Sequence, residues 1–65
     1  MILRKVSNLK EGDYVVLTSQ PPRRLNAIEP SSIRDGYYIL EIAFDGTKST
    51  QHILLADDYV EIVIL

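Results

Sequence analysis

The stretch that decides the fold reads YYILEIAFDG, residues 37–46, and it predicts one long strand that ends in a tight turn. Apolar residues run almost unbroken from Tyr37 to Phe44, as expected of a strand that is buried on one face and partly covered on the other. We expect Phe44 to be a core aromatic. Asp45-Gly46 follows at once, and this pair between two apolar runs is a strong hairpin signal because both residues tolerate a positive φ.

Turn signals recur about every ten residues on both sides of this hairpin, and no segment keeps an apolar period of 3.6 over helical length. The expected strands are therefore residues 14–18, 23–29, 37–44, 49–55 and 59–65, with residues 2–6 as a candidate sixth. The stretch Ser19-Gln20-Pro21-Pro22 is a predicted turn, because proline cannot donate the hydrogen bonds of a sheet. Residues 30–36 hold a proline, two serines and an Asp-Gly pair, which predicts a loop.

The number of strands and the length of the chain, 65 residues, define the fold class. So short a chain has room for one hydrophobic core, and residues 1–65 are expected to form a single domain. A two-sheet sandwich of immunoglobulin size needs more strands, whereas a small bent barrel closes most of its own edges. We predict an all-β domain, a small SH3-like barrel of five to six strands. An OB-fold is the alternative, but it usually has a longer chain and a helix between strands.

The composition predicts a cytoplasmic protein without a membrane anchor. The chain has no cysteine, which removes disulfides and thiolate metal sites and favours a reducing compartment. Charge begins at Arg4, too soon for a signal peptide, and no run approaches the ~20 apolar residues of a membrane span. The net charge of −2 argues against a protein that coats DNA.

The charge is unevenly distributed along the chain. Residues 1–34 carry six basic and three acidic side chains, whereas residues 35–65 carry one basic and six acidic ones. Such asymmetry is a recognised sign of a polyanion contact on the basic side. The alternative is that these charges only solvate the outer face of the barrel.

Four segments resemble one family of translation factors. LKEGDYVV at residues 9–16 matches a Leu-Lys-x-Gly-x-Tyr-Val opening, and PRRL at residues 22–25 stands where the family has Pro-Cys-Arg-Val. IAFDGTKS at residues 42–49 matches a Gly-x-Phe-Asp-Gly-x-Lys-Arg hairpin, and ADDYVEI at residues 56–62 matches Val-Asp-Ala-x-Val-Glu-Val. The chain is thus similar to the N-terminal, KOW-type SH3-like domain of the hypusine-containing archaeal and eukaryotic factor, whose bacterial relative is elongation factor P. The resemblance implies a ribosome- or RNA-associated accessory protein.

Two departures separate the chain from the activity of that family. The family's loop between its second and third strands carries a Lys-x-Gly-Lys-His-Gly signature with a modified lysine, whereas residues 29–36 are shorter and contain no lysine. Hypusine chemistry is therefore not expected at this loop. We also expect no counterpart of the OB-fold that forms the family's second domain, so the resemblance implies a lone barrel that binds.

A basic rim is the predicted contact with RNA. Arginine holds a phosphate through two hydrogen bonds and stacks on a base, and an exposed tyrosine adds a stacking platform. Strand alternation requires one of Tyr37 and Tyr38 to point inward, where it would serve the core, and the other ring can equally be a cross-strand partner. The predicted nucleic-acid-binding residues are Arg4, Lys5, Arg23, Arg24, Arg34 and Tyr38.

No residue pattern in the chain supports catalysis, a cofactor or a metal, so we do not expect an enzyme. His52 is the only imidazole, and it lies in mid-strand with Gln51 and Ile53 as its neighbours. The adjacent Asp57 and Asp58 point to different sides and have no third ligand, so they bind Mg²⁺ or Ca²⁺ poorly. They are interpreted as turn residues.

Three binding functions remain open. The first is binding of RNA, above all ribosomal RNA, through the basic rim. The second is a protein-interaction or self-assembling module, monomeric or homodimeric, in which the apolar residues 60–65 pair with a partner's sheet edge. The third is a double-stranded DNA binder of the small archaeal chromatin type, which is the weakest because seven basic residues release few counterions. Clustering of the basic residues on one face favours a polyanion, and scatter favours a protein partner.

Overall fold

The computed structural model describes residues 1–17 and 20–64. Thr18, Ser19 and Leu65 lie outside the described residues, so the predicted end of the strand at 14–18, the predicted turn at Ser19 and the last residue of the predicted strand 59–65 are not placed. The described residues contain six strands and one short 3₁₀ turn. The predicted all-β class is therefore confirmed, and the candidate strand at residues 2–6 is present.

All neighbouring strands are antiparallel and belong to one sheet. The elements are β1 (Ile2–Lys5), the 3₁₀ turn η1 (Val6–Asn8), β2 (Tyr14–Val16), β3 (Arg23–Pro30), β4 (Tyr37–Asp45), β5 (Lys48–Leu55) and β6 (Tyr59–Val63). The order across the sheet is β1-β6-β2-β3-β4-β5. Strands β2 to β5 follow one another in sequence and in space, whereas β6 returns to lie between β1 and β2.

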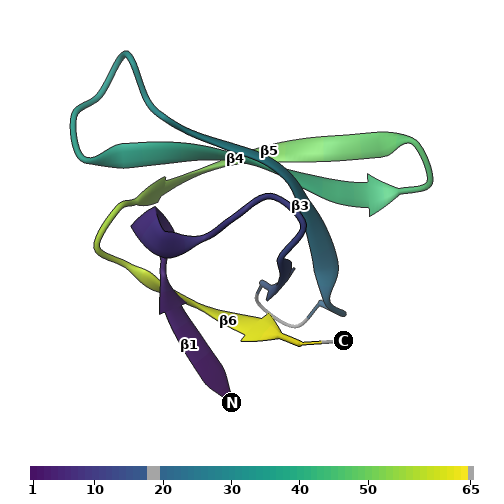
Figure 1. Ribbon diagram of the computed structural model, residues 1–65. Helices are drawn as coiled ribbons and strands as arrows, with labels where there is room; N and C mark the ends of the chain where they lie inside the picture. Colours follow the sequence, from purple (N-terminus) through teal and green to yellow (C-terminus); the bar gives the residue numbers. More distant parts are fainter. Residues whose placement is uncertain (18–19, 65) are drawn as a thin grey trace.

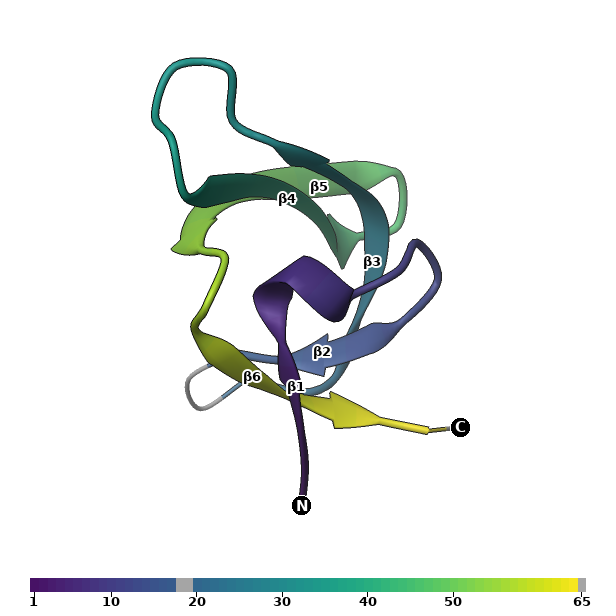
Figure 2. The ribbon, with the colours of Figure 1, turned by 60° about the vertical axis from the view of Figure 1, so that its left-hand side comes forward.

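Strand β3 bends the sheet. Its first two residues pair with β2, whereas its residues from Leu25 onward pair with β4, and a register shift lies between Leu25 and Ala27. A bulge of this kind increases the local twist of a strand. The sheet therefore curls into a barrel-like shape, as seen in Figure 1 and Figure 2. The curl is not closed, because β1 and β5 are the two ends of the strand order.

The core lies inside this curl. It consists of eight buried aliphatic residues, Val6, Leu9, Val15, Leu25, Leu40, Ile42, Val60 and Ile62. Alternate residues of a strand face opposite sides, so Leu40 and Ile42 point inward from β4 while Ile39 and Glu41 lie on the outer face. Val6 enters the core from η1, and its amide donates to the Asp58 carbonyl at 2.8 Å.

The prediction that residues 60–65 form a free edge is wrong for the part of this stretch that the structure describes. On β6, Ile62 lies opposite Ile2 of β1 on one side and opposite Val15 of β2 on the other. The apolar character of β6 reflects this interior position, because Val60 and Ile62 belong to the core. A partner strand therefore finds no free row of backbone groups there.

The expectation that Phe44 belongs to the core is also wrong, because 51% of its surface is exposed. A register shift between Ala43 and Asp45 places it at the rim of the barrel, beyond the last inward residue of β4, Ile42. The guanidinium of Arg23 lies 5.2 Å from the centroid of its ring and donates to its carbonyl. Phe44 and Arg23 thus cover the rim together.

The hairpin predicted at Asp45-Gly46 is confirmed. Asp45 pairs with Lys48, so Gly46 and Thr47 form a two-residue turn between β4 and β5. Gly46 has a φ of 56°, in the left-handed region that tight hairpin turns use and that glycine adopts at low cost. In the described part of the chain, no helix has the length and apolarity needed to cross a membrane.

Candidate interaction surface at the free edge of the sheet

Strand β5 has a neighbour on one side only. It pairs with β4, and among the described residues no strand pairs with its second side. The Tyr37 carbonyl accepts a hydrogen bond from the Ser31 amide at 2.9 Å, on the side of β4 away from β5. The backbone groups of Tyr37 therefore point away from β5, so Tyr37 and Leu55 form a non-hydrogen-bonded pair. Such pairs alternate with hydrogen-bonded pairs along an antiparallel ladder. The backbone groups of Leu55, and by alternation those of Ile53 and Gln51, therefore point toward the free edge.

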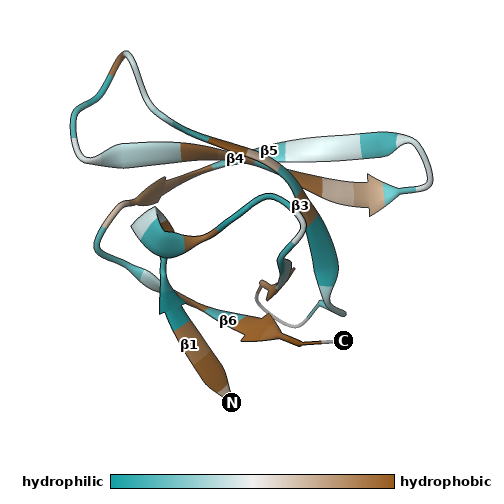
Figure 3. Ribbon diagram, in the orientation of Figure 1, coloured by the Kyte–Doolittle hydropathy of each residue, from teal (hydrophilic) through white to brown (hydrophobic). Residues whose placement is uncertain are grey.

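An apolar surface lies beside this edge, on the face opposite the core. The register pairs Tyr37 with Leu55 and Ile39 with Ile53, and paired residues share one face of a sheet. Ile53 is 61% exposed and Leu55 is 43% exposed. We call Tyr37, Ile39, Ile53 and Leu55 the outer apolar patch. Figure 3 shows the hydrophobic colouring of β4 and of the end of β5.

Strand β5 lacks the features that usually keep edge strands from pairing. Natural edges carry charges, prolines or bulges, or they are short. In β5 the only Lys, Arg, Asp or Glu is Lys48 at the first position, and the strand has no proline. The other end of the sheet differs, because β1 is four residues long and carries both Arg4 and Lys5. Residues 49–55 thus present a neutral edge.

Of the predicted site residues, Arg23 and Arg24 lie at the start of β3 and point to different sides of the strand. Arg23 donates to the Gln20 side chain at 3.3 Å in addition to its contacts with Phe44. Arg24 donates from Nη1 to Oδ1 of Asn26 at 2.8 Å. Both guanidinium groups therefore already bond to protein atoms, although Arg24 remains exposed.

Arg34 lies in the loop beyond the far end of β3, roughly 25 Å along the strand from Arg23. Its guanidinium stacks on Tyr37, 4.8 Å from the ring centroid. Tyr38 has the inward phase of β4 and packs, half-buried, against the core. Of the two tyrosines, Tyr37 therefore stacks with Arg34, whereas Tyr38, the predicted contact residue, packs against the core.

Arg4 and Lys5 lie on β1, and each is paired with a carboxylate. The Arg4 Nη1 atom is 3.4 Å from Oδ2 of Asp13, and the Lys5 Nζ atom is 3.6 Å from Oδ1 of Asp57. Both pairs are partly exposed, so their contribution to stability is small. Their acidic partners reduce the positive potential that Arg4 and Lys5 present to a polyanion.

The predicted basic residues are thus distributed over three places, which are β1, the start of β3 and the loop after β3. Arg34 is separated from the others, whereas Arg4 pairs with Asp13 and the Arg24 guanidinium lies beside Gly12, so these two flank the same turn. Affinity for a polyanion requires several phosphates to be neutralised together. The carboxylate partners of Arg4 and Lys5 and the separate position of Arg34 therefore reduce the positive charge that these residues present together.

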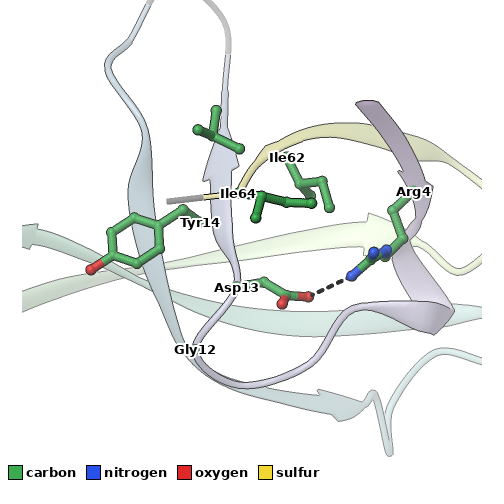
Figure 4. Close-up of a pocket in the computed structure, with 7 residues that line it drawn as sticks. Arg4, Gly12, Asp13, Tyr14, Ile62 and Ile64 are labelled. Atoms are coloured by element: carbon green, nitrogen blue, oxygen red, sulfur yellow. Dashed lines mark hydrogen bonds and ion pairs between the residues drawn. The ribbon is translucent and has the colours of Figure 1, made fainter. Parts of the chain in front are cut away.

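A pocket of about 250 Å³ lies beside β2 and β6 (Figure 4). It is lined by Arg4, Gly12, Asp13, Tyr14, Ile62, Val63 and Ile64. The Asp13 carboxylate on its wall bonds to Arg4 and accepts the Lys10 amide at 2.9 Å. Because these opposite charges neutralise each other, the pair serves to tie β1 to the turn before β2. The volume is also below the range of roughly 300–1,000 Å³ that is usual for small-molecule sites.

Comparisons of the chain with protein-family models, with curated proteins and with solved structures found no match. The family resemblance of the four segments therefore remains a prediction. Function is inferred from the geometry of β5 and of the residues around it.

The free edge of β5 is not predictable from the sequence, because strand order depends on long-range pairing that local patterns do not encode. One signal was present. Gln51, Ile53 and Leu55 alternate with His52 and Leu54, so an outer face with two aliphatic residues could have been derived from the period of two. That β5 has a free side becomes visible only when β6 is seen to pair elsewhere.

Proposed function

We propose that this protein is a non-catalytic protein-interaction module that binds its partner through strand β5. The observation that carries the proposal is the free, neutral edge at residues 49–55, with the outer apolar patch beside it. A partner segment in extended conformation adds to the sheet as a further strand. Its backbone bonds to the outward groups of Gln51, Ile53 and Leu55.

The two parts of this surface have different roles in binding. Backbone hydrogen bonds supply affinity for any extended segment, whereas side-chain contacts determine which segment is preferred. Every second side chain of the partner strand lies on the outer face beside Ile53 and Leu55, where burial contributes about 25 cal/mol per Å² of apolar area. We therefore expect an interface at the small end of the usual range, below roughly 1,200 Å², and a transient complex.

Binding to RNA is the competing proposal, and it rests on the family resemblance. The observation in its favour is the stacking of Arg34 on Tyr37, because an arginine beside an aromatic ring also suits a nucleobase. The distance of Arg34 from Arg23 and the carboxylate partners of Arg4 and Lys5 weigh against it. Any test of β5 must therefore distinguish a protein from RNA.

A capture experiment with two matched baits makes this distinction. Ile53→Lys places a charge in the outer apolar patch, and Ile64→Lys makes the same change at an exposed residue after β6, distant from β5 in the strand order. From extracts of the source cells, the wild type and Ile64→Lys should retain the same protein, and Ile53→Lys should lose it. Nuclease treatment should leave the capture unchanged. Retention by Ile53→Lys, or loss on nuclease treatment, would overturn the proposal.

A further inference from the structure

We propose that the partner of β5 is a second copy of this chain, paired antiparallel about a two-fold axis at Ile53. The inference rests on the proposed function of β5 and specifies its partner. A strand that pairs antiparallel with its own copy presents the same surface on both sides, which is the usual arrangement in homodimers. Strands β1 and β5 lie at the two ends of the sheet. Because β1 is shorter and carries two charges, β5 is the edge that suits pairing with a second copy.

Symmetry restricts the registers that this pairing can adopt. A residue whose backbone groups point outward must face another such residue, so the axis passes through a residue and its own copy. The residues near the middle of the exposed edge, Gln51, His52 and Ile53, are the candidates for this position. A centre at Gln51 places Ile53 opposite Ser49 of the second copy, and a centre at His52 places it opposite Gln51. Both leave the exposed Ile53 facing a polar residue.

A centre at Ile53 joins the two outer apolar patches. Ile53 then faces Ile53 of the second copy, and because Ile39 is its neighbour on β4, four isoleucines form one row across four strands. Gln51 faces Leu55 of the second copy, so residues 51–55 of each chain are paired. This length is five positions, whereas β1 pairs with β6 over four and β2 pairs with β6 over three.

The same register satisfies the backbone groups of the edge. Ile53 and its copy exchange both of their hydrogen bonds, and Gln51 and Leu55 do the same. The Leu55 carbonyl already accepts the Asp58 amide at 3.1 Å, and its second lone pair is available to the second copy.

Charges beyond the paired residues are complementary in this register. With Ile53 opposite its own copy, Lys48 lies beside Asp57 and Asp58 of the second copy. These two aspartates belong to the turn that follows β5. Asp57 is 92% exposed even though it pairs with Lys5. The two-fold axis forms this contact twice, so the only charge of β5 attracts the second copy instead of repelling it.

Single cysteines test the register, because the chain has no cysteine of its own. In the bonded pair at the axis, Ile53→Cys meets its copy at a Cα separation of about 5.5 Å, which suits a disulfide. Under mild oxidation, Ile53→Cys should form covalent dimers at least about tenfold faster than Gln51→Cys and Ile64→Cys. Equal rates for the three variants, or a faster reaction of Gln51→Cys, would overturn the pairing at Ile53.

Sedimentation equilibrium of cysteine-free protein tests the association itself. The average mass of the wild type and of Ile64→Lys should rise from one chain toward two with concentration, whereas Ile53→Lys should remain at one chain. A wild type that stays at one chain at every concentration would overturn the self-pairing. The two proposals fail separately: if β5 still captures a different protein in a manner that Ile53→Lys abolishes, the proposed function stands and only the second copy is refuted.

Discussion

Ile53 contributes to the fold through its backbone while its side chain remains exposed. It pairs with Ile39 across β4 and β5, yet most of its side chain is exposed to solvent. Complete burial of an isoleucine side chain is worth about 1.5–3 kcal/mol. A partner that buries the exposed part of Ile53 therefore gains part of this free energy on binding. Arg23 is the opposite case, because its guanidinium already contacts Phe44 and Gln20 and has fewer donors available for a partner.

The rim position of Phe44 leads to a prediction about stability. Phe44→Ala should lower the free energy of unfolding by about 1–2 kcal/mol, because half of the ring is exposed and one contact with Arg23 is lost. Leu40→Ala, at a fully buried position, should cost about 2–5 kcal/mol. Urea unfolding of both variants measures the difference. A cost for Phe44→Ala as large as that for Leu40→Ala would mean that the ring is buried.

The turn between β4 and β5 allows a second prediction. Gly46 has a left-handed φ and open space around the position of a Cβ, so substitution there changes only backbone strain. Gly46→Val should destabilise the domain by about 1–3 kcal/mol, whereas Gly46→Asn should cost much less because asparagine tolerates this region. Thermal unfolding of the two variants provides the comparison. Equal costs would show that the turn does not need the left-handed conformation.

At the scale of elements, β5 and β6 each contain three aliphatic residues and have opposite environments. Strand β6 lies between β1 and β2, whereas β5 is paired on one side. Turn residues and the period of two predict where these strands begin and end, because these features depend on local chemistry. The position of each strand in the sheet depends on pairing over long sequence distances, and the apolar pattern of residues 60–65 therefore wrongly predicts an edge.

Amide hydrogen exchange should distinguish the two strands. In dilute protein, the amides of Gln51 and Ile53 on β5 should exchange faster than those of Thr50 and His52, which bond to β4. On β6 no such alternation is expected, since both sides of the strand are paired. Nuclear magnetic resonance resolves the individual rates. Uniform protection along β5 in dilute protein would mean that its second side is already covered.

At the scale of the whole molecule, the net charge and the distribution of charges together determine the affinity for a polyanion such as RNA. The chain carries a net charge of −2, and the five basic residues of the predicted site stand on β1, at the start of β3 and in the loop after β3. Sequence counts show the excess of basic residues in the first half, but they do not show that Arg4 and Lys5 meet Asp13 and Asp57 in the fold. The class of fold is thus predictable from the sequence, whereas the grouping of charges depends on which strands become neighbours.

This distribution predicts weak binding to RNA. Arg23→Ala combined with Arg24→Ala should change the affinity for ribosomal RNA at physiological salt by less than about twofold, because Arg23 already contacts Phe44, Arg24 bonds to Asn26, and the nearby Arg4 is paired with Asp13. The free energy of unfolding should change by about 1 kcal/mol or less through the lost contact with Phe44. Fluorescence anisotropy over a salt series measures the affinity. Tight, salt-sensitive binding that the double variant abolishes would favour RNA as the partner.

The most direct test of binding through β5 is site-specific photo-crosslinking in the source cells. A photoreactive amino acid at Gln51 lies on the outer face of the free edge, and the same group at the exposed Glu11 lies before β2 as a control. Binding through β5 predicts a discrete protein adduct at Gln51 that is absent at Glu11, whether the adduct is a second copy or another chain. An RNA adduct at Gln51, or the same adducts at both positions, would contradict it.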